Sequence, residues 1–161
     1  MTKSILRKYA KLIVKMGVNI KKGQGAVILA DTAQSEIALM VAEEAYRAGA
    51  KWVDIRWTNQ DLDKMRYKKE SVKVLSATQE WEKARMQYEL DELPVRIWID
   101  SDDPDGLKGV NVEKMQKANL ARMKVRKPYR DAMENKYQWT IVAVPLSLIH
   151  ISEPTRPEPI S

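Results

Sequence analysis

Four short runs of strand-forming residues, separated by longer stretches of helical periodicity, constrain the fold of this chain most strongly. The runs are Gly25–Ala30, Lys51–Trp57, Val95–Asp100 and Gln138–Val144. The first, GAVILA, contains no polar side chain, which is typical of a strand covered on both faces. Because strands and helices alternate, we expect an α/β fold: a mostly parallel sheet of four or more strands with helices on its faces.

The segments around the first strand predict two helices. Apolar residues recur at a spacing of about 3.6 over Ser4–Met16, which gives a first helix one apolar face. Gly17 follows where a left-handed residue commonly ends a helix. Asp31 and Thr32 are suited to cap a second helix, which we expect to end at Gly49. Its predicted core face is Ile37, Ala38, Val41, Ala45 and Ala48.

The second half of the chain is richer in charge. Residues 59–93 indicate one or two helices, and a long helix is predicted over Val112–Lys136, where Pro128 allows a kink. Four of the five tryptophans lie on predicted strands or at their ends, so we interpret them as core or interface anchors rather than as surfaces for stacking bases. The five are Trp52, Trp57, Trp81, Trp98 and Trp139.

Composition excludes several classes of protein. The 161 residues suit one domain, or one domain and part of another. The chain has no cysteine, so it has no disulfide framework, thiolate zinc site or cysteine nucleophile. It also lacks an apolar run of about 18 residues and an N-terminal secretion signal. We therefore expect a cytoplasmic protein that does not enter membranes.

The positive charge is unevenly distributed. Net charge is +6, and residues 1–22 carry seven lysines and arginines and no acid. A second basic stretch spans Lys114–Arg130. No nucleic-acid-reading motif accompanies either segment, so we favour solvated helix faces. The alternative is a standalone basic α/β module that binds nucleic acid through both helices.

The search for catalytic groups finds none. Residues 1–145 contain no histidine, so neither a Ser–His–Asp triad nor a histidine-containing metal site is available there. The acidic segment Asp100–Gly106 fails the calcium-loop pattern at Pro104 and Asn111 and is interpreted as a turn.

The sequence motifs give little indication of a phosphate-binding site. The G-x-G at Gly23 and Gly25 precedes a strand, whereas a dinucleotide fingerprint follows one, so a turn is favoured. A flavodoxin-like site near Asp31 and Trp57 is a further hypothesis, although Asp31 would repel a phosphate. We therefore expect no catalytic, cofactor-binding or metal-ligating residue in the chain.

Several motifs in order resemble a known family. They are Gly25–Ala30, the AYRAGA segment Ala45–Ala50, the strand Val53–Trp57 and the WTIVAVP segment Trp139–Pro145. Together they resemble the N-terminal region of the M29 family of bacterial metallo-aminopeptidases, the aminopeptidase T group. The resemblance covers residues 1–145.

The resemblance implies a fragment. Members of that family are much longer, bind two divalent metal ions through Glu, His and Asp residues of a C-terminal catalytic domain, and release N-terminal amino acids from peptides. They form homodimers that enclose the active sites. None of their metal-ligand motifs matches a position here. Residues 1–145 would then be the non-catalytic N-terminal domain, inactive and metal-free alone, with the missing catalytic domain as its natural partner.

The last sixteen residues, 146–161, differ from the rest. Leu146–Arg156 resembles the conceptual translation of a transposase-type sequencing adapter, LSLIHISEPTR. We therefore expect residues 146–161 to be an unstructured artefact, which removes His150 from consideration. A proline-rich terminus and a partner-binding motif are the alternatives.

Overall fold

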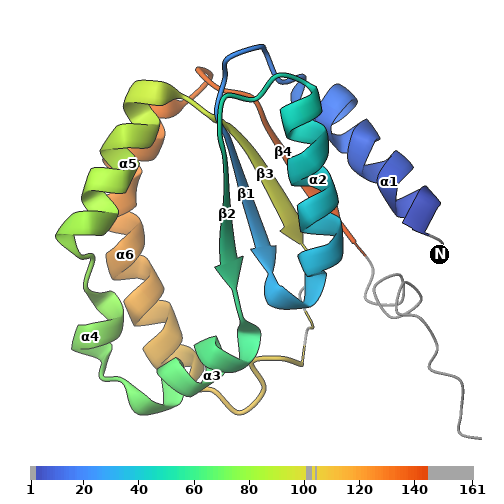
Figure 1. Cartoon of the computed structure of the whole chain (residues 1–161). Coiled ribbons are helices and arrows are strands. Elements are labelled where there is room, and N and C mark those ends of the chain that lie inside the picture. The colour runs from blue at the N-terminus through green and yellow to red at the C-terminus, as the bar shows by residue number, and fades with distance from the viewer. Residues whose placement is uncertain (1–2, 101–102, 104, 145–161) are drawn as a thin grey trace, which may run out of the picture.

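Four parallel strands form one sheet in a computed structural model that describes residues 3–100, 103 and 105–144. Their order is β2-β1-β3-β4, and each neighbouring pair is parallel. Helices lie on both sides of the sheet (Figure 1). The expected α/β fold is therefore confirmed. The strands are β1 (Ala26–Asp31), β2 (Val53–Thr58), β3 (Val95–Asp100) and β4 (Trp139–Ala143).

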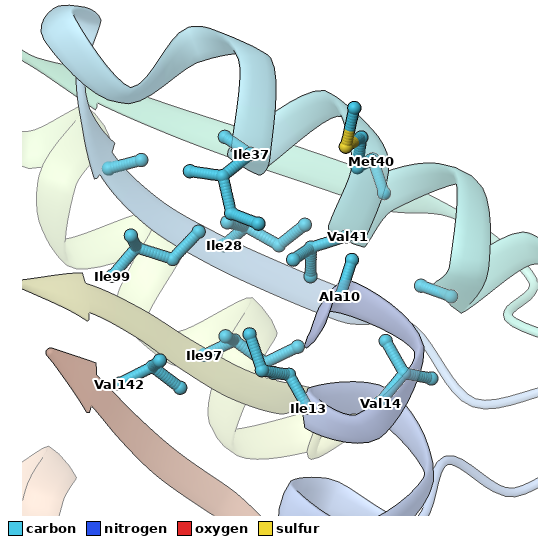
Figure 2. Close-up of a cluster of buried hydrophobic side chains, with 14 of the residues drawn as sticks. Ala10, Ile13, Val14, Ile28, Ile37, Met40, Val41, Ile97, Ile99 and Val142 are labelled. Atoms are coloured by element: carbon cyan, nitrogen blue, oxygen red, sulfur yellow. The ribbon is translucent and has the colours of Figure 1, made fainter. Parts of the chain in front are cut away.

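One side of the sheet is covered by α1 (Lys3–Leu12), which continues as a π-helical turn over Ile13–Val18, and by α2 (Ser35–Arg47). A short 3-10 turn, Thr32–Gln34, joins β1 to α2. Both helices present aliphatic side chains to the sheet, so this side holds the main core (Figure 2). Its labelled members include Ala10, Ile13, Ile28, Ile37, Val41, Ile97 and Val142.

The end of the first helix differs from the prediction. The helix continues through Gly17 to Val18, and Asn19 takes the left-handed conformation with φ 44°. A Cβ at Gly17 would lie 3.2 Å from the Thr140 Cγ2 atom, so glycine permits close contact with β4. By contrast, Gly49 has φ +103°, as expected of a residue that ends a helix.

The other side of the sheet carries α3 (Gln60–Lys69), α4 (Val72–Ser76) and α5 (Glu80–Glu92), followed by α6 (Val112–Met133). The prediction of one or two helices over 59–93 was wrong, because three form. Two N-terminal caps begin the second and third of these helices. The Ser71 side chain accepts a hydrogen bond from the Val74 N–H at the start of α4, and Gln79 and Glu82 form a capping box at the start of α5.

The long helix is otherwise as predicted, since α6 continues through Pro128, but it ends at Met133 rather than Lys136. No helix in the described ranges is long and apolar enough to cross a membrane. The predicted tail, residues 146–161, lies outside the described residues.

The tryptophans do not form the core. None of the five is buried. Trp57, Trp81 and Trp139 are 43%, 62% and 57% exposed. Of the two predicted roles, core or interface anchor, the first is not what the structure shows, because the core is built from aliphatic side chains on the α1–α2 side. Their role as interface anchors stays a prediction.

Candidate functional site

At the carboxyl edge of the sheet, where open α/β folds usually bind ligands, the end of β1 is held by hydrogen bonds of the chain itself. The backbone N–H groups of Ala33 and Gln60 donate to the two carboxylate oxygens of Asp31, at 2.9 and 3.1 Å. Asp31 thus caps the 3-10 turn Thr32–Gln34 rather than α2 itself, whose N-cap is Gln34, and it also ties the end of β1 to α3. The hypothesis of a ligand near Asp31 and Trp57 gains no support from this arrangement.

The G-x-G segment is a turn, as interpreted from the sequence. Gly23 has φ +82°, a conformation that favours glycine. A Cβ at Gly25 would lie 2.3 Å from the Trp52 Cζ2 atom, so the second glycine allows the backbone to pass the indole. The amide nitrogen of Gln24 donates to the Leu93 carbonyl at 3.2 Å. These contacts explain both glycines without a phosphate ligand.

The described residues do not fit the metal centre that the resemblance implies for the complete protein. They contain no group of three or more His, Cys, Asp or Glu side chains able to hold an ion. In the acidic turn, Asp103 accepts hydrogen bonds from the backbone N–H groups of Asp105 and Gly106, each at 2.9 Å. Residues 101, 102 and 104 of that turn lie outside the described ranges. No metal-dependent step is assigned to this part of the chain.

A buried ion-pair cluster joins the sheet to α5. Glu89 is 3% exposed at its side chain, and its carboxylate contacts Arg56 of β2 and Arg96 of β3. The Arg96 Nη2 atom lies 2.6 Å from Glu89 Oε2. Burial, together with the charges of Arg85 and Arg96, lowers the pKa of Arg56 to about 10. Both guanidinium groups remain protonated near neutral pH, so Glu89 compensates two buried cations.

This cluster was not predicted from the sequence. The sequence did contain a signal for it: Arg56 of β2 and Arg96 of β3 lie between apolar residues of their strands. The geometry is that of a structural ion-pair network rather than a catalytic one, since it includes no nucleophile and no open position.

A cavity of about 450 Å³ lies among α3, α4 and α6, the helices at the lower left of Figure 1. Three arginines line it: Arg66 of α3 and Arg122 and Arg126 of α6. The Arg122 guanidinium donates to the Ala77 carbonyl and to Glu82 Oε1, each at 2.8 Å. The basic stretch Lys114–Arg130 is therefore not uniformly a solvated face, because two of its arginines border a cavity.

The basic residues of α1 agree better with the interpretation of a solvated helix face. Its lysines and Arg7 are exposed. The Arg7 Nη1 atom lies 2.9 Å from Glu43 Oε2 of α2. Such a pair between exposed side chains is common on protein surfaces and contributes little to stability.

Comparison with known proteins agrees with the fold. The family model described as thermophilic metalloprotease (M29) matches residues 2–149. Aminopeptidase PepS of Streptococcus thermophilus is 32% identical over 142 residues, which are 88% of this chain and 34% of that protein. Aminopeptidase AmpS of Bacillus subtilis is 30% identical over 85% of this chain and 34% of its own length.

A solved structure shows the same likeness. Wild-type AmpT from Thermus thermophilus superposes with a TM-score of 0.78 at 30% identity, covering 88% of this chain and 36% of that one. The chain thus spans about a third of the length of the curated relatives that it matches. The family match extends over nearly all of the described residues, and the chain belongs to the M29 family of metallopeptidases.

Proposed function

We propose that this chain is the non-catalytic N-terminal domain of a metal-dependent aminopeptidase that releases N-terminal amino acids from peptides. One observation carries the proposal: nearly the whole described chain matches M29 aminopeptidases, yet it spans only about a third of their length. The remaining length would supply the catalytic domain, with its two divalent metal ions, and the contacts of a homodimer.

The side chains of the described residues support a non-catalytic role. Metal-ligating side chains do not gather among them, and at the end of β1 the Asp31 carboxylate is already occupied by two backbone N–H donors. The buried carboxylates are paired with arginines: Glu89 with Arg56 and Arg96 of the sheet, and Glu44 with Arg47 of its own helix. These pairs stabilise the fold rather than presenting reactive groups.

The exposed β4 edge of the sheet supports the proposal that further chain packs against this domain. β4 is the last strand in the sheet order, and its side chains Trp139 and Ile141 are 57% and 60% exposed. An edge strand with exposed apolar side chains favours pairing or covering by further chain. We propose that the rest of the aminopeptidase covers this edge.

An activity assay tests the proposal. The purified 161-residue chain, checked for α/β structure by circular dichroism, is incubated with an amino-acid arylamide and cobalt, zinc or magnesium ions. Aminopeptidase AmpS of Bacillus subtilis serves as the positive control. We expect no hydrolysis above the buffer blank. Hydrolysis by the 161-residue chain that a chelator abolishes would contradict the non-catalytic assignment.

Sequencing of the source locus tests the remainder of the proposal. A long read across codons 145 and 146, from a library prepared without transposase adapters, is expected to continue the reading frame into codons for Glu, His and Asp ligands. If the locus instead encodes residues 146–161 followed by a stop codon, the aminopeptidase proposal fails for this chain. The nucleic-acid-binding alternative would then be tested first.

A further inference from the structure

The cavity among α3, α4 and α6 combines cationic and apolar walls. Its apolar wall is formed by Leu75, Ala118 and Met123, and its volume of about 450 Å³ is within the usual range for small-molecule sites. The same cavity is bordered by the three arginines described above and by one carboxylate, Asp63. The lining residues alone therefore carry an excess of positive charge.

Two of the arginines are held in place by acids beside the cavity. Arg66 pairs with Glu70, with its Nε atom 2.6 Å from Glu70 Oε2. Arg122 pairs with Glu82 at 2.8 Å, and both side chains are largely buried, at 22% and 14% exposure. These pairs fix the walls of the cavity and neutralise two of its three cations, so that Arg126 and the Asp63 carboxylate are the remaining charges of the lining.

Arg126 is the cation that remains. Within the described ranges its guanidinium makes no hydrogen bond and no ion pair, although it lines the cavity and feels the charge of Glu82 at longer range. Arg126 is exposed at the surface, yet the neighbouring protein partly desolvates it. This desolvation and the nearby charge of Arg122 hold its pKa below the ordinary value. A bound anion would counteract both effects, since it would pair with Arg126 and reduce the repulsion from Arg122.

The side-chain amide of Asn119 is an uncharged hydrogen-bond donor in the same wall of the cavity. The Tyr67 hydroxyl donates to Asn119 Oδ1 at 3.3 Å. This hydrogen bond assigns the oxygen of the Asn119 amide to Tyr67 and leaves its N–H groups available for an acceptor. Both residues line the cavity.

We infer that this cavity binds a small organic anion, with its carboxylate or phosphate on Arg126 and Asn119 and its apolar part against Leu75, Ala118 and Met123. The planar guanidinium offers two parallel N–H donors, which suit both oxyanions. The inference does not depend on the aminopeptidase proposal, because the cavity is formed entirely by α3, α4 and α6 of this chain.

Calorimetric titration of the full 161-residue chain at low ionic strength tests the inference with two pairs of probes. The pairs are acetate with benzoate, and inorganic phosphate with phenyl phosphate. We expect the aromatic member of one pair to bind about tenfold more tightly than its small counterpart, because its ring buries apolar surface. A preference for benzoate identifies a carboxylate ligand, and a preference for phenyl phosphate identifies a phosphate ester.

Substitutions identify the residues involved. Arg126→Gln is expected to lower the affinity for the preferred probe at least about tenfold, since the substitution removes a charge-assisted hydrogen bond. Met123→Glu, at a position that is 49% exposed, is expected to abolish binding by adding a negative charge. The matched control is Lys124→Gln, which removes one exposed positive charge from the same helix outside the cavity and should change affinity less than about twofold.

Three results would overturn the inference. The first is no binding of any probe at millimolar concentrations. The second is equal affinity within both pairs, which would exclude an apolar subsite. The third is an equal loss in Lys124→Gln and Arg126→Gln, which would indicate attraction to the basic helix in general. Circular dichroism of each variant verifies that it is folded.

Discussion

Replacement of Glu89 by glutamine tests the physical account of the layer between the sheet and α5. The wild-type carboxylate is 3% exposed and contacts two arginines whose side chains are only 16% and 18% exposed. Glutamine preserves the size of the side chain but removes its charge. Among the described residues, Arg56 would then keep only the Asp54 carboxylate, whose Oδ2 atom lies 3.5 Å from its Nε atom. Arg96, whose ion pair is with Glu89, would lose that counter-ion.

The magnitude follows from that geometry. Removing one partner of a buried ion pair typically costs about 3–5 kcal/mol, because the remaining charge is left uncompensated. The repulsion between Arg56 and Arg96, which already contributes to the low pKa of Arg56, would add to this cost. A domain of this size has a total stability of about 5–15 kcal/mol. Glu89→Gln should therefore remove a large fraction of the free energy of unfolding.

Urea denaturation of the 161-residue chain, followed by circular dichroism, provides the assay. The midpoint should fall strongly for Glu89→Gln and remain unchanged for the control Glu80→Gln, whose side chain is 89% exposed. Joint replacement of Arg56, Glu89 and Arg96 by methionine should recover most of the loss, since no buried charge remains. A loss below about 1 kcal/mol for Glu89→Gln would refute the reasoning, because it would mean that water already solvates the two arginines.

Three further predictions concern packing, pH and solubility. Gly25→Ala should lower the urea midpoint by the equivalent of about 1–3 kcal/mol, because the added Cβ would lie 2.3 Å from the Trp52 ring, and the second change Trp52→Leu should reduce that loss. The pKa of Glu82 is below its ordinary value of 4.5: burial raises it, but hydrogen bonds from the Gln79 N–H and Arg122 outweigh burial. The folded state then binds fewer protons than the unfolded state, so stability should fall as pH drops below about 4.5; a pH series of denaturation midpoints should be flatter in Glu82→Gln, and an unchanged slope would contradict this. Trp139→Thr should increase the monomeric fraction in light scattering with little change in midpoint, and unchanged aggregation would exclude the β4 edge as its cause.

Local signals predicted the elements more reliably than their contacts. The apolar run of β1 was predicted correctly, and Asp31 was identified as a cap, although of the 3-10 turn before α2, because each feature depends on residues a few positions apart. The end of the first helix was misplaced at Gly17, since that glycine serves contact with Thr140 on a distant strand rather than a turn. The number of helices over 59–93 was underestimated because the cap at Ser71 was overlooked.

The sequence by itself determined that this chain alternates strands and helices, that its sheet is mostly parallel, and that residues 1–145 contain no histidine or cysteine for catalysis. Only the tertiary structure decided the strand order β2-β1-β3-β4, the pairing of Glu89 with two arginines, and the arrangement of Arg66, Arg122 and Arg126 around one cavity. Periodicity and caps act through the nearest turns of the backbone, so the sequence displays them directly. Charges on separate elements meet only after the layers pack, and the resulting burial determines which of them need a partner.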